Sequence, residues 1–251
     1  NPDYELMRLM NRYGFETVGF PYFGWLVAIQ TAVVKTALDL KINLIFYGED
    51  GELEYGGKSR TKKNPIFKVD YQKEIYTENS FEKVIKKIKN KDKYNFSYFK
   101  FESNKNKQLK KIDLTHWSSY EDWDPYRNYV VAKKFCNLQE SSSNNTGTFT
   151  NFAQNDQALV ALHTYMMFLK FGFGRTSADA AIEVRRGAMD RNQAINLVKL
   201  YDGLYPIEFE SLYLDYYKMS KKEFHNILDK FANKKILKKK GNSWVLKGAI
   251  N

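Results

Sequence analysis

The chain has 251 residues, of which 43% are hydrophobic and 16% aromatic, enough for one large or two small domains with an apolar core. No apolar run reaches the length of a membrane span and we identify no signal peptide, so we expect a cytoplasmic protein without a membrane partner. The single cysteine, Cys136, excludes an internal disulfide and a zinc site built from several thiolates.

A net charge of +11 raises the question of a nucleic-acid partner. Only eight of the 40 basic residues are arginines, and much of the lysine lies in surface-like runs such as 86–87, 105–111 and 234–240. Lysine-rich composition explains these runs at least as well as a phosphate-binding face, so nucleic acid is disfavoured. Half of the arginines lie close together, at 175, 185, 186 and 191, and guanidinium is the better donor to phosphate or carboxylate.

The first 57 residues predict the later part of an α/β nucleotide-binding domain. An amphipathic helix begins at Pro2 and ends near Gly14, and a helix that is apolar nearly all round follows at Phe20–Leu40. The short β-branched and aromatic run Ile42–Tyr47 then predicts a buried parallel strand. Helix, buried helix and buried strand are typical of a doubly wound sheet, here only partial.

Carboxylates follow this strand directly, and they are the first candidate site: Glu49, Asp50, Glu52 and Glu54. Ligands of open α/β sheets bind beyond the carboxyl ends of the strands, where carboxylates can hold a metal, take a proton or bind sugar hydroxyls. The alternative is an acidic surface turn interrupted by glycine.

Residues 58–111 are rich in Lys and Asn and are interpreted as an inserted, mainly structural module. Ile66–Val69 and Tyr94–Phe101 favour β-structure, and Ser80–Asn90 predicts a helix with Ser80 at its N-cap.

Residues 112–235 are predicted to be α-helical after an aromatic loop at Leu114–Asp124, and residues 236–251 are a tail in which Gly241–Ile250 is a candidate short strand. Asp124 caps a helix that has Pro125 at its first position and ends near Phe135. Further helices are expected at Gln154–Leu169, Ser177–Arg186, from Asp190 to Tyr201, from Pro206 to Tyr217 and from Ser220 to about Ala232. The pairs Asp190/Gln193 and Ser220/Glu223 have the spacing of capping boxes.

Two further candidate sites lie in this helical region. Asp156 and His163 share a helix face and, with Glu49, form a hypothetical metal site, but a helical histidine is more often structural, so no metal is predicted. Arg175 follows two glycines and precedes a helix N-terminus, which favours an anion site. A surface salt bridge between Glu183 and Arg186 is the structural alternative.

Several sequence blocks together resemble the N-acetyl sugar amidotransferases of lipopolysaccharide and surface-sugar biosynthesis, in the PP-loop ATP pyrophosphatase superfamily. The blocks occur in the family's order and span most of the chain: Gly19–Trp25, Ile45–Gly57, Trp123–Pro125, Gly147–Ala153, Lys170–Arg175 and Ile182–Gly187.

The resemblance implies conversion of an N-acetyl group to an acetamidino group, with ATP and Mg²⁺ as cofactors. It implies a free or nucleotide-activated N-acetyl sugar and a partner glutaminase assembly, similar to the histidine-biosynthesis pair, that supplies ammonia. Glu49 and Asp50 are the expected catalytic residues. Substrate binding is expected from Glu52, Glu54, Trp25, Arg175 and Arg186.

The pyrophosphate loop of this family, SGGxDS in pattern, is missing from the sequence, and Gly56–Ser59 lacks the spacing of a Walker loop. We therefore expect the chain to correspond to the part downstream of that loop and not to release pyrophosphate alone. Two alternatives stay open: an RNA-binding relative that modifies tRNA, and a non-catalytic scaffold that binds the glutaminase. The open sheet edge also predicts self-association.

Overall fold

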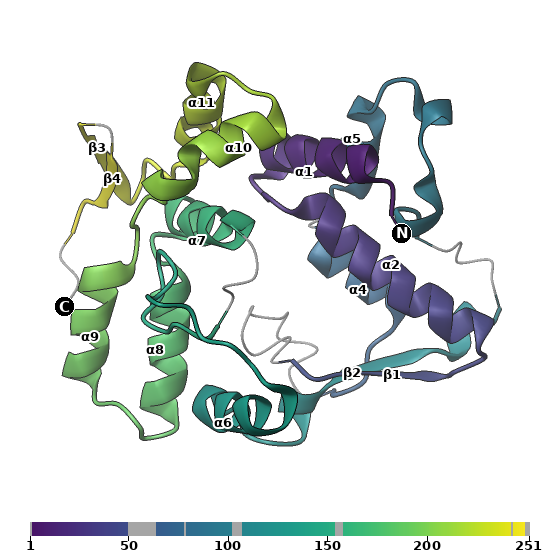
Figure 1. The fold of residues 1–251 in the computed structure, drawn as a ribbon, viewed down its shortest axis with the longest axis horizontal. Helices are drawn as coiled ribbons and strands as arrows, with labels where there is room; N and C mark the ends of the chain where they lie inside the picture. Colours follow the sequence, from purple (N-terminus) through teal and green to yellow (C-terminus); the bar gives the residue numbers. More distant parts are fainter. Residues whose placement is uncertain are drawn as a thin grey trace. The chain divides into compact units, whose positions relative to one another are not determined.

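A computed structural model describes residues 2–49, 64–77, 79–101, 107–153, 158–241 and 243–248 (Figure 1). In these residues the protein is a mixed α/β chain that is mostly helical and has two small two-stranded sheets. It divides into two compact units, residues 1–18 with 22–123 and residues 19–21 with 124–251. The regions predicted as 1–57 and 58–111 therefore belong to one unit, which extends to Trp123.

The first unit holds two long helices, a parallel strand pair and several short helices. Its elements are α1 (Tyr4–Val18), α2 (Phe23–Asp39), β1 (Leu44–Tyr47), α4 (Val69–Tyr76), α5 (Phe81–Lys87), η1 (Lys91–Lys93), η2 (Phe96–Tyr98), η3 (Leu109–Lys111), β2 (Asp113–His116) and η4 (Trp117–Ser119).

The core beside the strand pair joins residues from distant parts of the first unit. β1 and β2 are parallel, and Ile45 pairs with Leu114. Both side chains are buried in one cluster with Val34, Ala37, Phe67, Val69, Leu109 and Ile112. Full burial of an aliphatic or phenyl side chain is worth about 1.5–3 kcal/mol, so this cluster attaches α2 and α4 to the strands.

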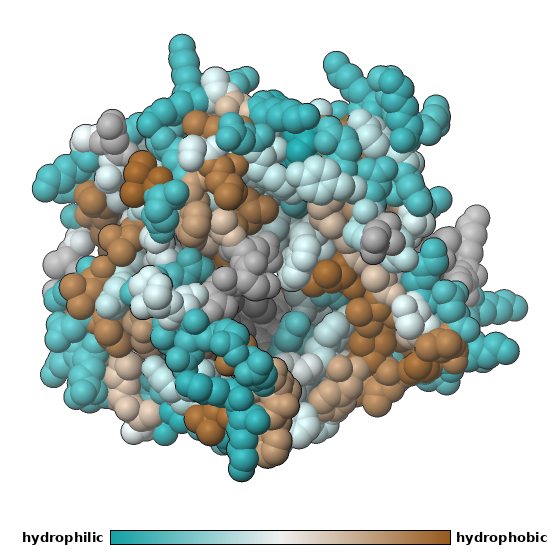
Figure 2. Space-filling view, viewed as in Figure 1, coloured by the Kyte–Doolittle hydropathy of each residue, from teal (hydrophilic) through white to brown (hydrophobic). Residues whose placement is uncertain are grey.

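The rest of β1 is less covered than a central strand would be. Leu44 and Phe46 are 51% and 48% exposed, as the predicted incomplete sheet requires. Figure 2 shows apolar side chains on the surface in the area of α2 and β1. Within the described residues the sheet has two strands, and a doubly wound arrangement is not seen. The prediction of a strand buried along Ile42–Tyr47 is wrong, because only Ile45 is fully enclosed.

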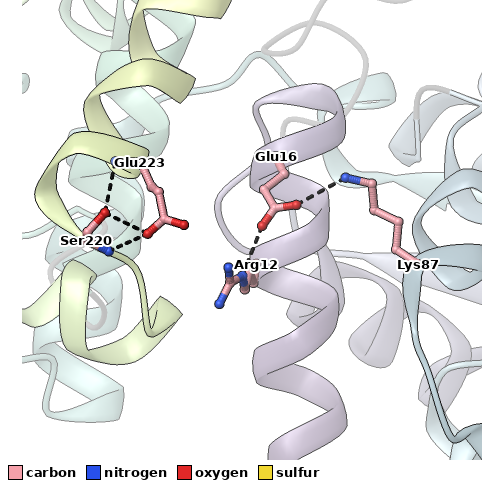
Figure 3. A network of polar contacts seen from close by, with 5 residues as sticks. All are labelled: Arg12, Glu16, Lys87, Ser220 and Glu223. Atoms are coloured by element: carbon pink, nitrogen blue, oxygen red, sulfur yellow. Dashed lines mark hydrogen bonds and ion pairs between the residues drawn. The ribbon is translucent and has the colours of Figure 1, made fainter.

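A small ionic network connects α1 with α5 in the first unit (Figure 3). Glu16 accepts from Arg12 at 3.0 Å and from Lys87 at 3.1 Å. Each of these side chains is partly exposed, so we assign the network a modest contribution to stability.

The second unit is helical with a C-terminal hairpin. Its elements are α6 (Pro125–Cys136), α7 (Ala158–Phe171), α8 (Arg175–Arg185), α9 (Arg191–Tyr201), η5 (Ile207–Phe209), α10 (Glu210–Tyr217), α11 (Lys221–Phe231), β3 (Leu237–Lys240) and β4 (Ser243–Leu246). β3 and β4 are antiparallel. β4 lies within Gly241–Ile250, where a short strand was a candidate, whereas β3, at the end of the lysine-rich run, was not predicted.

Three predicted helix starts of the second unit are confirmed by their hydrogen bonds, whereas α8 begins at Arg175, ahead of the predicted Ser177. The Asp124 carboxylate accepts from the backbone of Arg127 at the start of α6. Asp190 and Ser220 each form a complete capping box with the residue three positions later, and Figure 3 shows the Ser220 box with Glu223. Among the described helices, none is by itself long and apolar enough to cross a membrane; α1 and α2 pass that test only as a pair bent by 118°.

Candidate functional site at the carboxyl ends of β1 and β2

The parallel pairing places the last residues of β1 and β2 side by side. Tyr47 lies opposite His116, and Gly48 with Glu49 continues from one strand as Trp117 continues from the other. This edge is where open α/β sheets bind ligands. The sequence interpretation had assigned residues 114–124 to a loop, so β2 and His116 were missed. The alternation of Ile112, Leu114 and His116 was the signal for that strand.

His116 is a buried, neutral histidine in this site. Its side chain stacks on the rings of Phe67 and Tyr47, at centroid distances of 5.1 and 5.4 Å. Nε2 lies 3.3 Å from the Tyr76 hydroxyl. Burial lowers the pKa of His116 to about 4, so the imidazole is uncharged near pH 7. A neutral imidazole can accept or donate one proton, which suits it to orient a polar ligand or to move a proton.

Aromatic and amide groups fix the backbone of β1 around this histidine. The Tyr47 hydroxyl donates to Oε1 of Gln30 at 3.0 Å, which ties the end of β1 to α2. Phe46 packs against Trp117 and Tyr120, with centroids 5.9 and 5.8 Å apart. All three aromatic side chains stay partly exposed, and they form an apolar surface next to the strand ends.

Glu49 is the predicted catalytic residue whose position the structure describes. Although water reaches its surface, nearby protein atoms remove part of its hydration and raise the pKa of the carboxyl above 4.5. Among the described residues, no heavy atom lies within 4 Å of a Cβ built on Gly48, the residue before Glu49. Asp50, Glu52, Glu54 and residues 56–59 lie outside the described residues. Trp25 lies on α2, where its ring meets the edge of Tyr22.

The two predicted arginines belong to the second unit, where Arg175 begins α8 and Arg186 is the C-cap residue just after it, and both form ion pairs. Arg175 contacts Asp179 at 2.8 Å. Arg186 contacts Asp124 at 2.5 Å and Glu183 at 2.8 Å. Much of their positive charge is therefore neutralised by side chains of the same unit.

The N-terminus of α8 is capped from a distant part of the chain. The Asp202 carboxylate accepts from the backbone N–H of Gly174 at 2.9 Å and from the Ser177 hydroxyl at 2.5 Å. This carboxylate takes the place that an external anion would occupy at a free helix end. Sequence reasoning missed the cap because Asp202 lies 28 residues from Gly174.

The described residues contain no group of three His, Cys, Asp or Glu side chains placed to hold a metal ion. His163 is buried on α7 with its ring edge-on to Phe20 at 4.9 Å, and burial lowers its pKa to about 3. Asp156, its hypothetical partner, lies outside the described residues. His225, which has no evident partner in the sequence, contacts Glu210 at 2.8 Å.

Residues 146–249 match the family described as LPS biosynthesis protein WbpG-like, C-terminal domain. This match supports an origin of the chain in a lipopolysaccharide-biosynthesis family. The matched segment covers most of the second unit and contains both predicted arginines. No curated protein matches the chain.

Proposed function

We propose that this chain belongs to an ATP-dependent amidotransferase that converts an N-acetyl sugar to an acetamidino sugar in lipopolysaccharide biosynthesis. The observation that carries the proposal is the match of residues 146–249 to a lipopolysaccharide-biosynthesis domain. The blocks at Gly19–Trp25 and Ile45–Gly57, which resemble the N-acetyl sugar amidotransferases, add the reaction type.

The strand-end site supplies two groups suited to this substrate. The Glu49 carboxylate, with its raised pKa, accepts hydrogen bonds from sugar hydroxyls or from the N–H of the acetamido group. His116 is buried, so its stacking on Phe67 and its contact with Tyr76 would hold the end of β2 in place rather than bind the sugar directly. The exposed ring of Phe46 offers an apolar surface to the C–H face of the sugar.

The proposed reaction replaces the oxygen of the acetamido group with nitrogen from ammonia, and its energy source would be ATP. The described residues contain neither the pyrophosphate loop nor a donor set for Mg²⁺, so they do not fit either cofactor and we assign no step to them. We place ammonia supply with a glutaminase and cyclase-like partner, and the reaction in the cytoplasm.

The experiment measures acetamidino-sugar formation by the full-length protein with its ammonia source. We expect Glu49→Gln to abolish product while the thermal melt stays that of the wild type, and Asp50→Asn to reduce it. Glu82→Gln, an exposed glutamate in α5, is the matched control and should keep full activity. Wild-type turnover in both site variants would remove these residues from the mechanism, and absence of any acetamidino product from the wild type would overturn the proposed reaction.

A further inference from the structure

The loop between α7 and α8 presents two phenylalanines to solvent. Phe171 ends α7 and is 57% exposed, and Phe173 is 45% exposed. Their rings pack on each other at a centroid distance of 5.9 Å. Single exposed apolar residues are common on soluble proteins, but a packed pair of aromatic rings at one point of the surface is a candidate contact for an apolar partner.

The C-terminal hairpin holds this loop in place. A Cβ built on Gly172, at φ +80°, would lie 2.7 Å from Cδ1 of Ile236 and 3.3 Å from Cδ2 of Leu246. The backbone N–H of Asn233 donates to the carbonyl of Leu169 at 2.8 Å, just before the loop. The two phenylalanines therefore lie beside the turn that leads into β3 and beside the end of β4.

The segment that forms this turn and hairpin is strongly basic. Residues 221–248 contain nine lysines and two carboxylates, Glu223 and Asp229. Glu223 is engaged in the capping box with Ser220, and Asp229 binds Lys239 at 2.6 Å. Most of the lysine charge is therefore not balanced by the acidic residues of the segment itself.

Lysines lie close to the phenylalanines. Nζ of Lys170 lies 5.9 Å from the centroid of the Phe171 ring. Lys247, which follows β4, donates from its Nζ to the carbonyl of Lys234 at 2.6 Å, so these two residues are adjacent. The side chains of Lys234, Lys235 and Lys247 are exposed. We call the following residues the basic aromatic surface: Phe171, Phe173, Lys170, Lys234, Lys235 and Lys247.

The composition of this surface favours an anionic membrane over a nucleic acid. All of its charges are lysines, and no arginine follows Arg191 in the chain. An ammonium is a point charge without the fork that binds a phosphate in two places, so lysines suit negative charge that is spread over a surface. Phenylalanine rings that pack on each other leave less of each face free for a stacking base. Lysine beside exposed phenylalanine is instead typical of segments that lie in the interface of an anionic bilayer.

We propose that the basic aromatic surface binds the anionic face of a lipid bilayer. The ammonium groups contact lipid phosphates, while the rings of Phe171 and Phe173 enter the apolar boundary beneath the headgroups. Lysine stems are long enough to lie along that boundary with their charges in the headgroup layer. A lysine-rich composition would explain the charge of this surface, but it does not explain two exposed rings at the same place.

This surface would lie on a membrane without crossing it. It departs from the expectation that the protein has no membrane partner, which was based on spanning segments and signal peptides. The proposal goes beyond the proposed reaction and does not depend on it.

The test is co-sedimentation of the full chain with vesicles of phosphatidylglycerol and phosphatidylcholine, compared with vesicles of phosphatidylcholine alone. We expect binding to the mixed vesicles that falls as salt is added, because salt screens the attraction. Lys234→Gln combined with Lys235→Gln should weaken this binding about tenfold. Lys89→Gln combined with Lys91→Gln, an exposed pair in the first unit, is the matched control and should bind as the wild type does.

Brominated lipid tests whether the aromatic pair enters the bilayer. Phe171→Trp adds a tryptophan whose emission should be quenched by brominated phosphatidylcholine in the mixed vesicles. Phe135→Trp, at a position that is 72% exposed on α6, is the control, and its added emission should stay unquenched. Equal quenching at the two positions, or none at either, would overturn the proposed contact.

Other results would also overturn the proposal. These are failure of the wild type to bind the mixed vesicles, equal binding to phosphatidylcholine alone, and equal weakening by the two lysine variants. If polyuridylate RNA binds and the variant at Lys234 and Lys235 weakens only that binding, the surface belongs to a nucleic acid instead. None of these measurements uses a sugar or ATP, so failure of the proposed reaction and failure of this surface are distinguished.

Discussion

Glu210, the first residue of α10, makes the stability of the second unit depend on pH. Its carboxylate accepts from Tyr205 at 2.5 Å and from His225 at 2.8 Å, and it pairs with Lys221 at 2.6 Å. Burial by itself raises the pKa of Glu210, but these three donors outweigh it and hold the pKa at about 2, against an ordinary value of 4.5.

A pKa that folding lowers means that protonation favours the unfolded chain. The stabilising contribution of Glu210 is therefore complete above about pH 4.5 and is lost as the pH falls toward 2. At 1.36 kcal/mol per pKa unit the upper limit is about 3 kcal/mol. Because Lys221 is 67% exposed and solvent screens its charge, we expect about 1–2 kcal/mol.

The assay is urea unfolding between pH 2 and 7, followed by the fluorescence of Trp244 in the second unit. The other tryptophans, Trp25, Trp117 and Trp123, lie in the first unit and are replaced by Phe in every variant. Glu210→Gln should lower the free energy of unfolding at pH 7 by about 1–2 kcal/mol and equal its parent at pH 2. The exposed Glu208→Gln is the control. A difference between Glu210→Gln and its parent that stays constant over the whole pH range would refute the reasoning.

Three further predictions concern other parts of the molecule. The chain should self-associate through the open edge of β1, and Phe46→Lys should reduce the oligomer seen by light scattering, whereas Phe135→Lys at an exposed position on α6 should not. The ring signals of His116 should stay those of a neutral imidazole down to about pH 4 in an NMR titration; a midpoint near 6.5 would contradict its burial. Asp202→Ala should destabilise the second unit by about 1–2 kcal/mol in urea unfolding, because α8 loses its cap, while the exposed Asp215→Ala should have little effect.

Features determined within a few residues were predictable from the sequence. The caps of Asp124, Asp190 and Ser220 are confirmed, because donor and acceptor lie three positions apart. Ser80 does precede α5, but its side chain forms no cap hydrogen bond. The β-structure predicted at Tyr94–Phe101 is wrong. Aromatic residues favour β-structure only where a neighbouring strand can pair with the segment. Within Tyr94–Phe101 the residues Phe96–Tyr98 form the 3-10 helix η2 instead.

Features that depend on distant residues were not predictable in the same way. β2 pairs with β1 across almost 70 residues, so the partnership of Tyr47 and His116 leaves no local pattern. In the sequence, Asp202 has the pattern of an ordinary surface residue. Its role as the cap of α8 depends on the fold, which brings it next to Gly174. The alternation of Ile112, Leu114 and His116 was the local sign of β2 in the sequence. The aromatic residues that follow it favour a loop, and for that reason the strand was not predicted.

Part of the interior of the second unit is supplied by residues 19–21, which are separated in the sequence from the rest of that unit by residues 22–123. Gly19, at φ +65°, lies where a Cβ would come within 2.7 Å of Met166, and the carbonyl of Pro21 accepts from the buried hydroxyl of Tyr217 at 2.7 Å. A recombinant fragment starting at Asp124 would lose the hydrogen bond between Tyr217 and Pro21, whose net contribution is about 1 kcal/mol. Cutting this protein between Trp123 and Asp124 would therefore yield a weakened fragment, and a short peptide containing residues 19–21, added in trans, should restore part of its stability.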